Sequence, residues 1–329
     1  MYEAFYGLRE RPFDLTTNPR FLLLTGKHRE ALSNLQYGLM SRRGLTLLVG
    51  EAGTGKTTLV QATIQGFERQ GAKIAYLNNP TLTRGEFYEF LAGAFELDPA
   101  TAHSKVRLLR ELEQKLGERR AAGILSGLIL DEVQALPDEL LEEVRLLANI
   151  ETPTDKLLPI VLAGQPELAD RLNQPSLRQL KQRVALRCSL EALDPRETAE
   201  YIAGRIRVAG GNSVLVFTRQ AVEAVFEGSG GIPRLISVIC DNSLISGFAA
   251  DRRPVSREIV DDVCRDFDLR GKKKAEPLTG TAAVQPSAAP GTVGVAAHAE
   301  GVRPAPPAKS TPGKSLFEHF SVRRRFSLF

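Results

Sequence analysis

One short stretch near the start of the sequence restricts this chain most. An apolar strand, Leu45–Val49, leads into Gly50-x-x-x-x-Gly55-Lys56-Thr57, and an apolar-periodic helix opens at the last of these residues. Glycines allow the backbone to approach a polyphosphate closely, and the following helix start adds positive potential. A chance glycine turn has no reason to carry the correct strand before it and the correct helix after it. The stretch therefore predicts a phosphate-binding loop that takes a nucleoside triphosphate.

Each fixed position in this loop has an expected task. Lys56 would reach the β- and γ-phosphates, and the Thr57 hydroxyl would join the shell of a Mg²⁺ ion. The expected cofactors are therefore a nucleoside triphosphate and Mg²⁺. The loop residues expected to contact the nucleotide are Gly50, Glu51, Ala52, Gly53, Thr54, Gly55, Lys56, Thr57 and Thr58.

Composition and charge describe an ordinary soluble protein. Of 329 residues, 43% are hydrophobic and 25% are charged, and the formal net charge is only +4. Much of the positive surplus falls late in the sequence, at Lys272–Lys274 and Arg323–Arg325. The remainder is close to neutral, which argues against a broad nucleic-acid surface. The start of the sequence lacks signal-peptide features and no run is long enough to span a membrane, so we expect a cytosolic protein.

The cysteines carry no metal or disulfide signal. Cys188, Cys240 and Cys264 are far apart and each has apolar neighbours. They are expected to be buried, reduced thiols.

A second strand pattern ends in two adjacent acids. The apolar run Gly127–Leu130 leads directly into Asp131 and Glu132. In phosphate-loop proteins the first acid at this point holds Mg²⁺ through water, and the second orients or deprotonates the attacking water. Surface acids at a strand end are common in isolation, but the apolar run and its spacing from the glycine loop argue against that reading. The adjacent pair favours hydrolysis over phosphoryl transfer to a metabolite.

Two further residues have open interpretations. Gln165 follows a predicted strand, Leu157–Ala163, and is a candidate for positioning water or sensing the γ-phosphate; the alternative is a polar residue at a helix N-terminus. Phe13 lies in an aromatic, proline-containing segment and either covers the nucleotide base or packs in the core.

The order of elements predicts an α/β fold. Five strand patterns alternate with helix patterns up to Leu190, which favours a parallel sheet covered on both faces, and only helix patterns follow.

The last fifteen residues interleave four phenylalanines with three arginines; they dock on a protein, lie on an anionic membrane, or have no function. The expected divisions are an aromatic segment and helix packed on the ATPase core (1–44), the phosphate-loop domain (45–190), a helical lid (191–270), a disordered Ala/Pro-rich linker (271–314) and a Phe/Arg-rich peptide (315–329).

Several motifs together resemble one family. A five-stranded phosphate-loop domain with a helical lid resembles the AAA+ ATPases, and over about residues 1–270 the chain resembles the ExeA (GspA) general secretion pathway family. Larger members of that family continue into a membrane span and a periplasmic region, whereas this sequence continues into the Ala/Pro-rich stretch. The motifs are Met1-Tyr-x-x-Phe5-Tyr6-Gly-Leu-x-x-x-Pro12-Phe13, Asn18-Pro-Arg-Phe21, the glycine loop, Asp131-Glu132-x-Gln134, Ala163-Gly-Gln165-Pro-Glu-Leu168, Leu177-Arg-Gln-Leu-x-Gln-Arg183 and Gly231-Ile-Pro-Arg234.

The resemblance implies roles for three arginines. The position of Arg183 in its motif resembles that of an arginine finger, which completes a neighbouring subunit's site; Arg178 is the second candidate. An arginine supplied by a neighbouring subunit would make hydrolysis depend on formation of a homo-oligomer. Arg234 is similar to the sensor that contacts the γ-phosphate from the helical lid. The alternatives are surface ion pairing for the first two and helix N-terminal solvation for Arg234.

The implied function is an ATP-hydrolysing switch or motor that remodels or assembles a protein client in secretion or envelope polysaccharide export. We expect it in the cytoplasm, at most peripheral at the inner membrane face. The alternative is an ATP-dependent DNA-binding regulator of the transposition type, which a basic face on the helical lid would favour. The choice of ATP over GTP rests on the resemblance, because no guanine-reading motif is evident.

Overall fold

The computed structural model describes residues 1–15, 19–21, 25–42, 44–78 and 81–269. Residues Met1–Lys274 form one compact unit, to which all described residues belong. The expected linker (271–314) and terminal peptide (315–329) lie outside the described residues.

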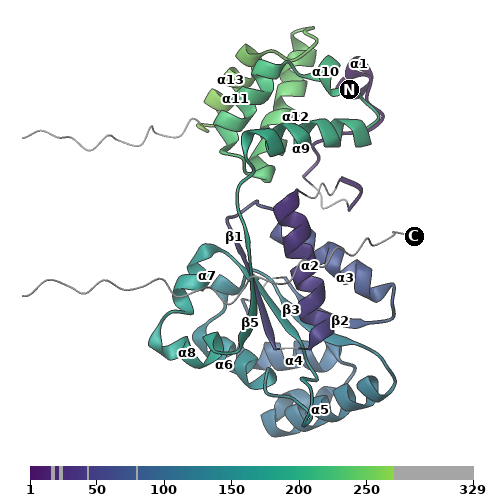
Figure 1. The fold of residues 1–329 in the computed structure, drawn as a ribbon, viewed down its shortest axis with the longest axis vertical. Coiled ribbons are helices and arrows are strands. Elements are labelled where there is room, and N and C mark those ends of the chain that lie inside the picture. Colours follow the sequence, from purple (N-terminus) through teal and green to yellow (C-terminus); the bar gives the residue numbers. More distant parts are fainter. Residues whose placement is uncertain (16–18, 22–24, 43, 79–80, 270–329) are drawn as a thin grey trace, which may run out of the picture. The chain divides into compact units, whose positions relative to one another are not determined.

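A five-stranded sheet is the centre of the fold (Figure 1). The strand order is β2-β3-β4-β1-β5, and every neighbouring pair is parallel. The carboxyl ends of all five strands therefore lie along one edge, where loops can build a ligand site. The strands are β1 (Leu45–Gly50), β2 (Lys73–Leu77), β3 (Ser126–Leu130), β4 (Ile160–Gly164) and β5 (Val184–Leu190).

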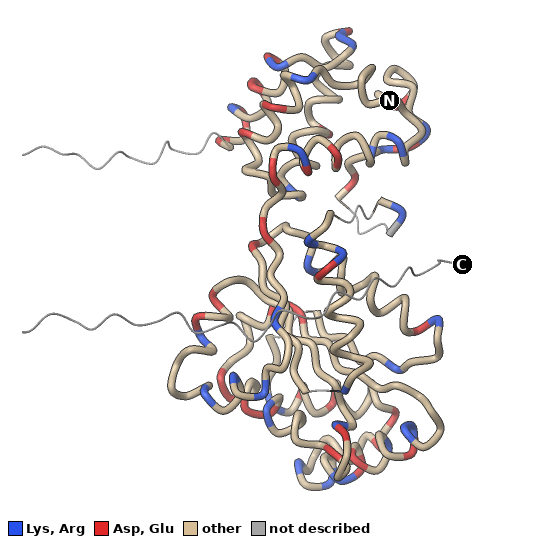
Figure 2. The backbone as a smooth tube through the Cα atoms, viewed as in Figure 1, with Lys and Arg blue, Asp and Glu red and all other residues tan. Residues whose placement is uncertain are grey.

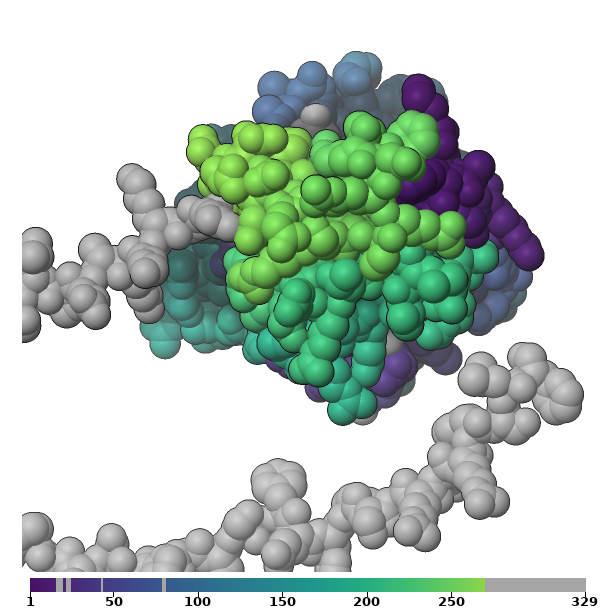
Figure 3. Space-filling model, turned by 90° about the horizontal axis from the view of Figure 1, so that it is seen from above, coloured from purple at the N-terminus to yellow at the C-terminus, as the bar shows by residue number. Residues whose placement is uncertain are grey.

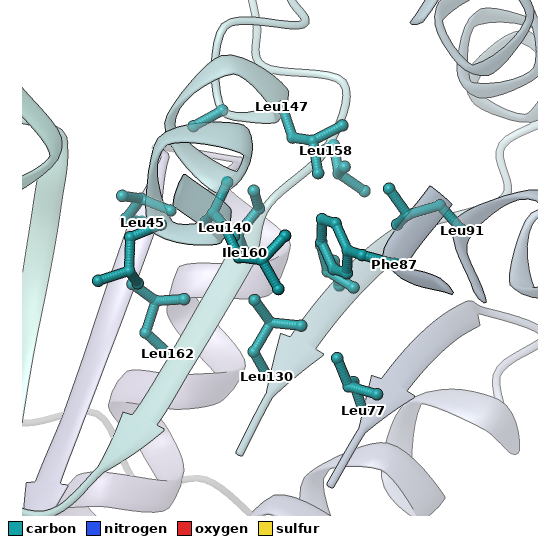
Figure 4. Packing of buried hydrophobic residues seen from close by; sticks show 14 of the residues in the cluster. Leu45, Leu77, Phe87, Leu91, Leu130, Leu140, Leu147, Leu158, Ile160 and Leu162 are labelled. Atoms are coloured by element: carbon teal, nitrogen blue, oxygen red, sulfur yellow. The ribbon is translucent and has the colours of Figure 1, made fainter. Parts of the chain in front are cut away.

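Helices cover both faces of this sheet, as the continuous apolar strands require. Side chains alternate along each strand, so that Leu47 points to one face and Leu48 to the other. The first face packs on α4–α6, where Phe87 and Leu140 are fully buried (Figure 4), and the second packs on α2 and α3. The helices up to β5 are α1 (Tyr2–Tyr6), α2 (Gly26–Ser41), α3 (Lys56–Glu68), α4 (Arg84–Ala94), α5 (Lys105–Ala121), α6 (Asp138–Leu147), α7 (Pro166–Arg171) and α8 (Arg178–Lys181).

After β5 the chain is helical. Asp194 and Glu197 form a capping box at the start of α9, with Pro195 at the first helical position. A second hydrophobic core fills the space between these helices. The parallel five-stranded sheet followed by helices is thus the predicted fold class. The helices are α9 (Pro195–Val208), α10 (Ser213–Val216), α11 (Arg219–Ser229), α12 (Pro233–Ala249) and α13 (Arg257–Asp266); short 3₁₀ helices are η1 (Pro19–Phe21), η2 (Pro99–His103), η3 (Val133–Ala135) and η4 (Pro175–Leu177).

Strand β4 begins later than its apolar pattern predicts. Leu157 and Leu158 are buried but precede the strand, which starts at Ile160. Pro159 lies between these two residues and the strand, and proline lacks the N–H that a residue of a central strand must donate to its neighbour.

The N-terminal segment differs from our expectation. Tyr2, Tyr6 and Phe13 belong to the helical core rather than to the sheet, and Figure 3 shows the purple segment against the green helices. Phe5 makes an edge-to-face contact with Phe248 of α12, at 5.5 Å between ring centroids. Aromatic side chains bury large areas wherever an apolar surface accepts them, and sequence distance does not reveal which surface that is. Among the described residues of this range, helix α2 is the part that packs on the sheet.

Tyr6 provides a stability test of this docking. Its ring is 1% exposed and its hydroxyl donates to the Arg252 carbonyl at 3.1 Å. We expect Tyr6→Phe to lower the free energy of unfolding by about 1 kcal/mol, because a partly buried carbonyl loses its donor. Urea denaturation measures the change. Tyr37→Phe is the matched control, since Tyr37 is 50% exposed; equal stability of the two variants would contradict the docking.

No helix within the described ranges has the length and apolar character needed to cross a bilayer. The three cysteines are buried as reduced thiols. Burial raises the pKa of Cys188.

Candidate functional site: a phosphate-loop pocket

The glycine loop closes a turn between β1 and α3. Gly53 and Gly55 have φ of 82° and 100°, values that a residue with a Cβ rarely adopts. Lys56 Nζ donates to the carbonyls of Gly50 (2.8 Å) and Glu51 (3.0 Å), so its ammonium group lies inside the turn. Burial lowers the pKa of Lys56, although the nearby acids oppose this shift. A buried cation held only by carbonyl oxygens suits a site that receives a stronger anionic partner.

The two acids that follow β3 lie near the glycine loop, although β4 separates β3 from β1 in the sheet. Asp131 is 1% exposed, and its Oδ2 accepts a hydrogen bond from Thr57 Oγ1 at 2.7 Å. Tyr76 donates to the same oxygen at 3.4 Å, and burial together with Asp131 raises the pKa of Tyr76 to about 12. A hydroxyl and a carboxylate oxygen therefore lie side by side where the loop ends.

Glu132 has an unusual backbone conformation. Its φ of 53° lies in the left-handed region, which costs an L-residue roughly 1–2 kcal/mol. Asp131 Oδ1 accepts from the Glu132 N–H at 3.0 Å and so holds this conformation. The strained residue is thus the predicted catalytic acid itself, and backbone strain is common at functional sites.

Two glutamines hold the Glu132 carboxylate. Gln134 Nε2 donates to Glu132 Oε2 at 2.5 Å, and Gln165 Nε2 approaches the same oxygen at 3.5 Å. Gln134 Oε1 in turn accepts from the Gln165 N–H at 3.0 Å. Gln165 is the residue before α7, so it occupies a helix N-terminus and also faces the acid. Sequence reasoning assigned no role to Gln134, although it stands within the Asp131-Glu132-x-Gln134 motif.

The helices after β5 contact the loop directly. The Arg234 N–H donates to the Gly53 carbonyl at 3.2 Å. A Cβ at Gly53 would lie 2.8 Å from the Arg234 Cβ, so this approach requires glycine. Arg234 thereby lies at the pocket that its predicted sensor role requires.

A cavity of about 350 Å³ adjoins the glycine loop, Glu132 and Arg234, whereas Asp131 and Gln165 are not among its lining residues. It is bounded by the glycine loop and Glu132 on one side and by the N-terminal segment with α9 and α12 on the other. A nucleotide-sized volume is typical of such ligand sites. The lining residues are Asp14, Leu15, Phe21, His28, Ala52, Gly53, Thr54, Gly55, Lys56, Thr57, Thr58, Glu132, Tyr201, Arg205, Pro233, Arg234 and Ser237.

Some predicted site residues lie elsewhere. Phe13 is 1% exposed, packs edge-to-face on Phe217 and is not among the lining residues, which leaves core packing as its observed role. Its neighbours Asp14 and Leu15 line the cavity instead. Buried Arg205 explains this, because its guanidinium donates to the carbonyls of Pro12 (2.5 Å) and Asp14 (3.1 Å) and fixes the segment.

Arg183 and Arg178 lie away from the loop of their own chain. Arg183 precedes β5, and the parallel register pairs Val184 with Leu45 at the strand end opposite to the glycine loop. Six residues of extended strand separate the two ends, which is roughly 20 Å. Arg178 is exposed at the start of α8, and within the described residues neither arginine forms a salt bridge.

Comparisons with known proteins agree with this geometry. Residues 39–172 match a family model described as an AAA domain. The chain is 42% identical over 250 residues to General secretion pathway protein A from Aeromonas hydrophila, covering 76% of this chain and 45% of that protein. The chain thus spans less than half the length of this curated relative.

Solved structures share the fold. The Aeropyrum pernix ORC2 protein, in ADPNP–ADP complexes, has a TM-score of 0.58 at 18% identity, covering 78% of this chain and 71% of that chain. Drosophila ORC bound to DNA has a TM-score of 0.59 at 19% identity, covering 78% and 64%. At these identities the likeness concerns the fold alone. The chain has an AAA-type fold, matches the AAA domain model over residues 39–172 and is similar to General secretion pathway protein A over most of its own length.

Proposed function

We propose that this chain binds ATP with Mg²⁺ and hydrolyses it, and that turnover drives remodelling or assembly of a partner protein in secretion or envelope export. One observation carries the proposal. The Thr57 hydroxyl and the Asp131 carboxylate lie 2.7 Å apart beside a loop whose buried Lys56 donates to the carbonyls of Gly50 and Glu51, with Glu132 in the same pocket. The name of the Aeromonas relative, General secretion pathway protein A, supports the secretion context.

The donor set fits Mg²⁺. Hard oxygen ligands from one or two protein groups, with waters and phosphates, are what this ion prefers. Thr57 Oγ1 and Asp131 Oδ2 are such oxygens, and their contact marks the point that the ion would occupy. Thr57 would bind it and Asp131 would hold its shell, while the ion would neutralise charge on the phosphates.

The chain's own groups divide the remaining work. Lys56 would bind the β- and γ-phosphates, and Glu132 would orient and deprotonate the attacking water. Gln165 and Gln134 would fix the carboxylate of Glu132 in position. Arg234 would contact the γ-phosphate and pass its loss to helix α12, whose first turn it occupies.

The site is incomplete without a second copy of the chain. Among the described residues, the arginines that line the pocket are Arg205 and Arg234, and Arg183 lies roughly 20 Å along the strand from its own loop. We propose that Arg183 of a neighbouring copy reaches the γ-phosphate, so that hydrolysis requires a homo-oligomer.

The DNA-binding alternative gains no support from the helices after β5. Their cations alternate with acids (Figure 2), and Arg219, Arg257 and Arg265 each pair with a nearby carboxylate. Arg205 is buried and engaged with backbone carbonyls. Such charges do not form the basic face that phosphate contacts need.

Phosphate release from ATP by the purified chain tests the proposal. We expect Mg²⁺-dependent turnover that chelation of the metal removes. Lys56→Ala should weaken ATP binding about tenfold, because a charge-assisted phosphate contact is lost. Binding of a fluorescent ATP analogue measures this effect, with exposed Lys181→Ala as the control. Equal ATP affinity of the two variants would contradict the assignment of the loop.

A further inference from the structure

A histidine outside the glycine loop contacts its backbone. His28 lies in the first turn of α2 and is 6% exposed. Its Nε2 lies 3.1 Å from the Thr54 carbonyl oxygen, and its Nδ1 lies 2.8 Å from Thr25 Oγ1. The ring also lines the nucleotide cavity, 3.5 Å from where a Cβ on Gly55 would stand. None of the roles described above uses this side chain.

The partners fix which ring nitrogen carries the proton. A carbonyl oxygen only accepts, so Nε2 must be the donor to Thr54. Nδ1 then accepts from the Thr25 hydroxyl, whose oxygen in turn accepts from the His28 N–H at 3.4 Å. Burial lowers the pKa of His28, which favours the neutral ring that this arrangement needs. The N-cap of α2 thus sets the tautomer of the ring.

The contact acts on one peptide plane of the loop. In a trans peptide the carbonyl of Thr54 and the N–H of Gly55 point in opposite directions. Gly55 has φ of 100° and little intrinsic restriction, so this plane needs an external contact to define it. Thr54 itself is fully buried, with its N–H and hydroxyl both directed to the Glu51 carbonyl. Because the Thr54 carbonyl is directed to His28, the Gly55 N–H points away from His28.

We propose that His28 is a positioning residue for nucleotide binding: by donating to the Thr54 carbonyl it keeps the Gly55 N–H directed at the phosphates. This inference rests on the proposed binding of nucleotide by the loop. Backbone N–H groups of such loops cradle the α- and β-phosphates, so loss of the contact weakens both ATP and ADP. The catalytic step itself keeps its groups, so kcat at saturating ATP is expected to change little.

The experiment compares three substitutions in the full chain. His28→Ala removes the donor, His28→Gln places an amide N–H near the position of Nε2, and His28→Asn carries the same amide on a shorter side chain. We expect His28→Ala and His28→Asn to weaken ADP binding about tenfold, and His28→Gln to recover most of the wild-type affinity. Titration with a fluorescent ADP analogue gives Kd, and thermal unfolding with and without ADP separates binding from folding.

The two readouts distinguish the possible failures. If the wild type does not bind ADP, both the proposed function and this inference fail. If the wild type binds and His28→Ala binds equally well, the inference alone fails. A lower Tm without ligand, together with an unchanged ADP-induced rise in Tm, would also overturn it, because that result describes a structural histidine. Should His28→Ala not fold, the comparison of Gln with Asn still decides the case.

Discussion

Glu132→Gln is expected to reduce ATP turnover at least about 100-fold while ATP affinity stays within about twofold of wild type. The reason is that the amide keeps the shape of the side chain and can still accept from Gln134 Nε2, but it cannot take a proton from water. Steady-state phosphate release gives kcat, and binding of a fluorescent ATP analogue gives the affinity.

The control removes a similar charge nearby. Glu167 is exposed in the first turn of α7 and contributes to the field at Lys56. Glu167→Gln should therefore leave kcat within about twofold, because a screened surface charge has a small effect. If both glutamine variants turned over ATP at the wild-type rate, Glu132 would not be the residue that activates water.

Arg183→Ala is expected to reduce kcat about 1,000-fold, which is the lower range for loss of an arginine finger. Arg183 cannot act on its own loop, because it stands at the opposite end of the strand register, so its effect must come from another copy. ATP affinity should change far less, since the guanidinium acts on charge that develops during hydrolysis. Turnover at several protein concentrations measures both the loss and its dependence on assembly.

Arg178→Ala distinguishes the two candidate arginines. Arg178 is exposed at the start of α8, the short helix that precedes Arg183. Lys181→Ala is the control, because it removes another exposed cation from the same helix. We expect both variants to keep most of the wild-type turnover. A large loss in Arg178→Ala with normal Arg183→Ala would transfer the finger role to Arg178. Normal turnover in both arginine variants would show that neither Arg178 nor Arg183 acts as an arginine finger.

Much of the fold follows from local sequence patterns. The bounds of β1 and β3 agree within one residue with the predicted strands Leu45–Val49 and Gly127–Leu130. These features depend on neighbouring residues, which the sequence displays directly. The proximity of Thr57 and Asp131 could also be predicted from the sequence, because the carboxyl ends of parallel strands meet at one edge of the sheet.

Other features depend on contacts between distant parts of the chain. The aromatic residues Tyr2 and Tyr6 pack on α12, more than 200 residues later, and no periodicity indicates that partner. The functions inferred for His28 and Gln134 rest on single hydrogen bonds to a backbone carbonyl and a carboxylate. One histidine after an N-cap threonine is a weak signal, since most such residues serve only the helix.

Turnover in a mixture of Glu132→Gln and Arg183→Ala chains tests the central claim most directly. Each variant alone is expected to be nearly inactive. In random co-assembly, roughly a quarter of the sites pair an intact Glu132 with an intact Arg183 from the neighbouring copy, so the mixture should recover a corresponding part of wild-type turnover. A mixture no more active than its components, with wild-type turnover per chain independent of protein concentration, would contradict a shared site.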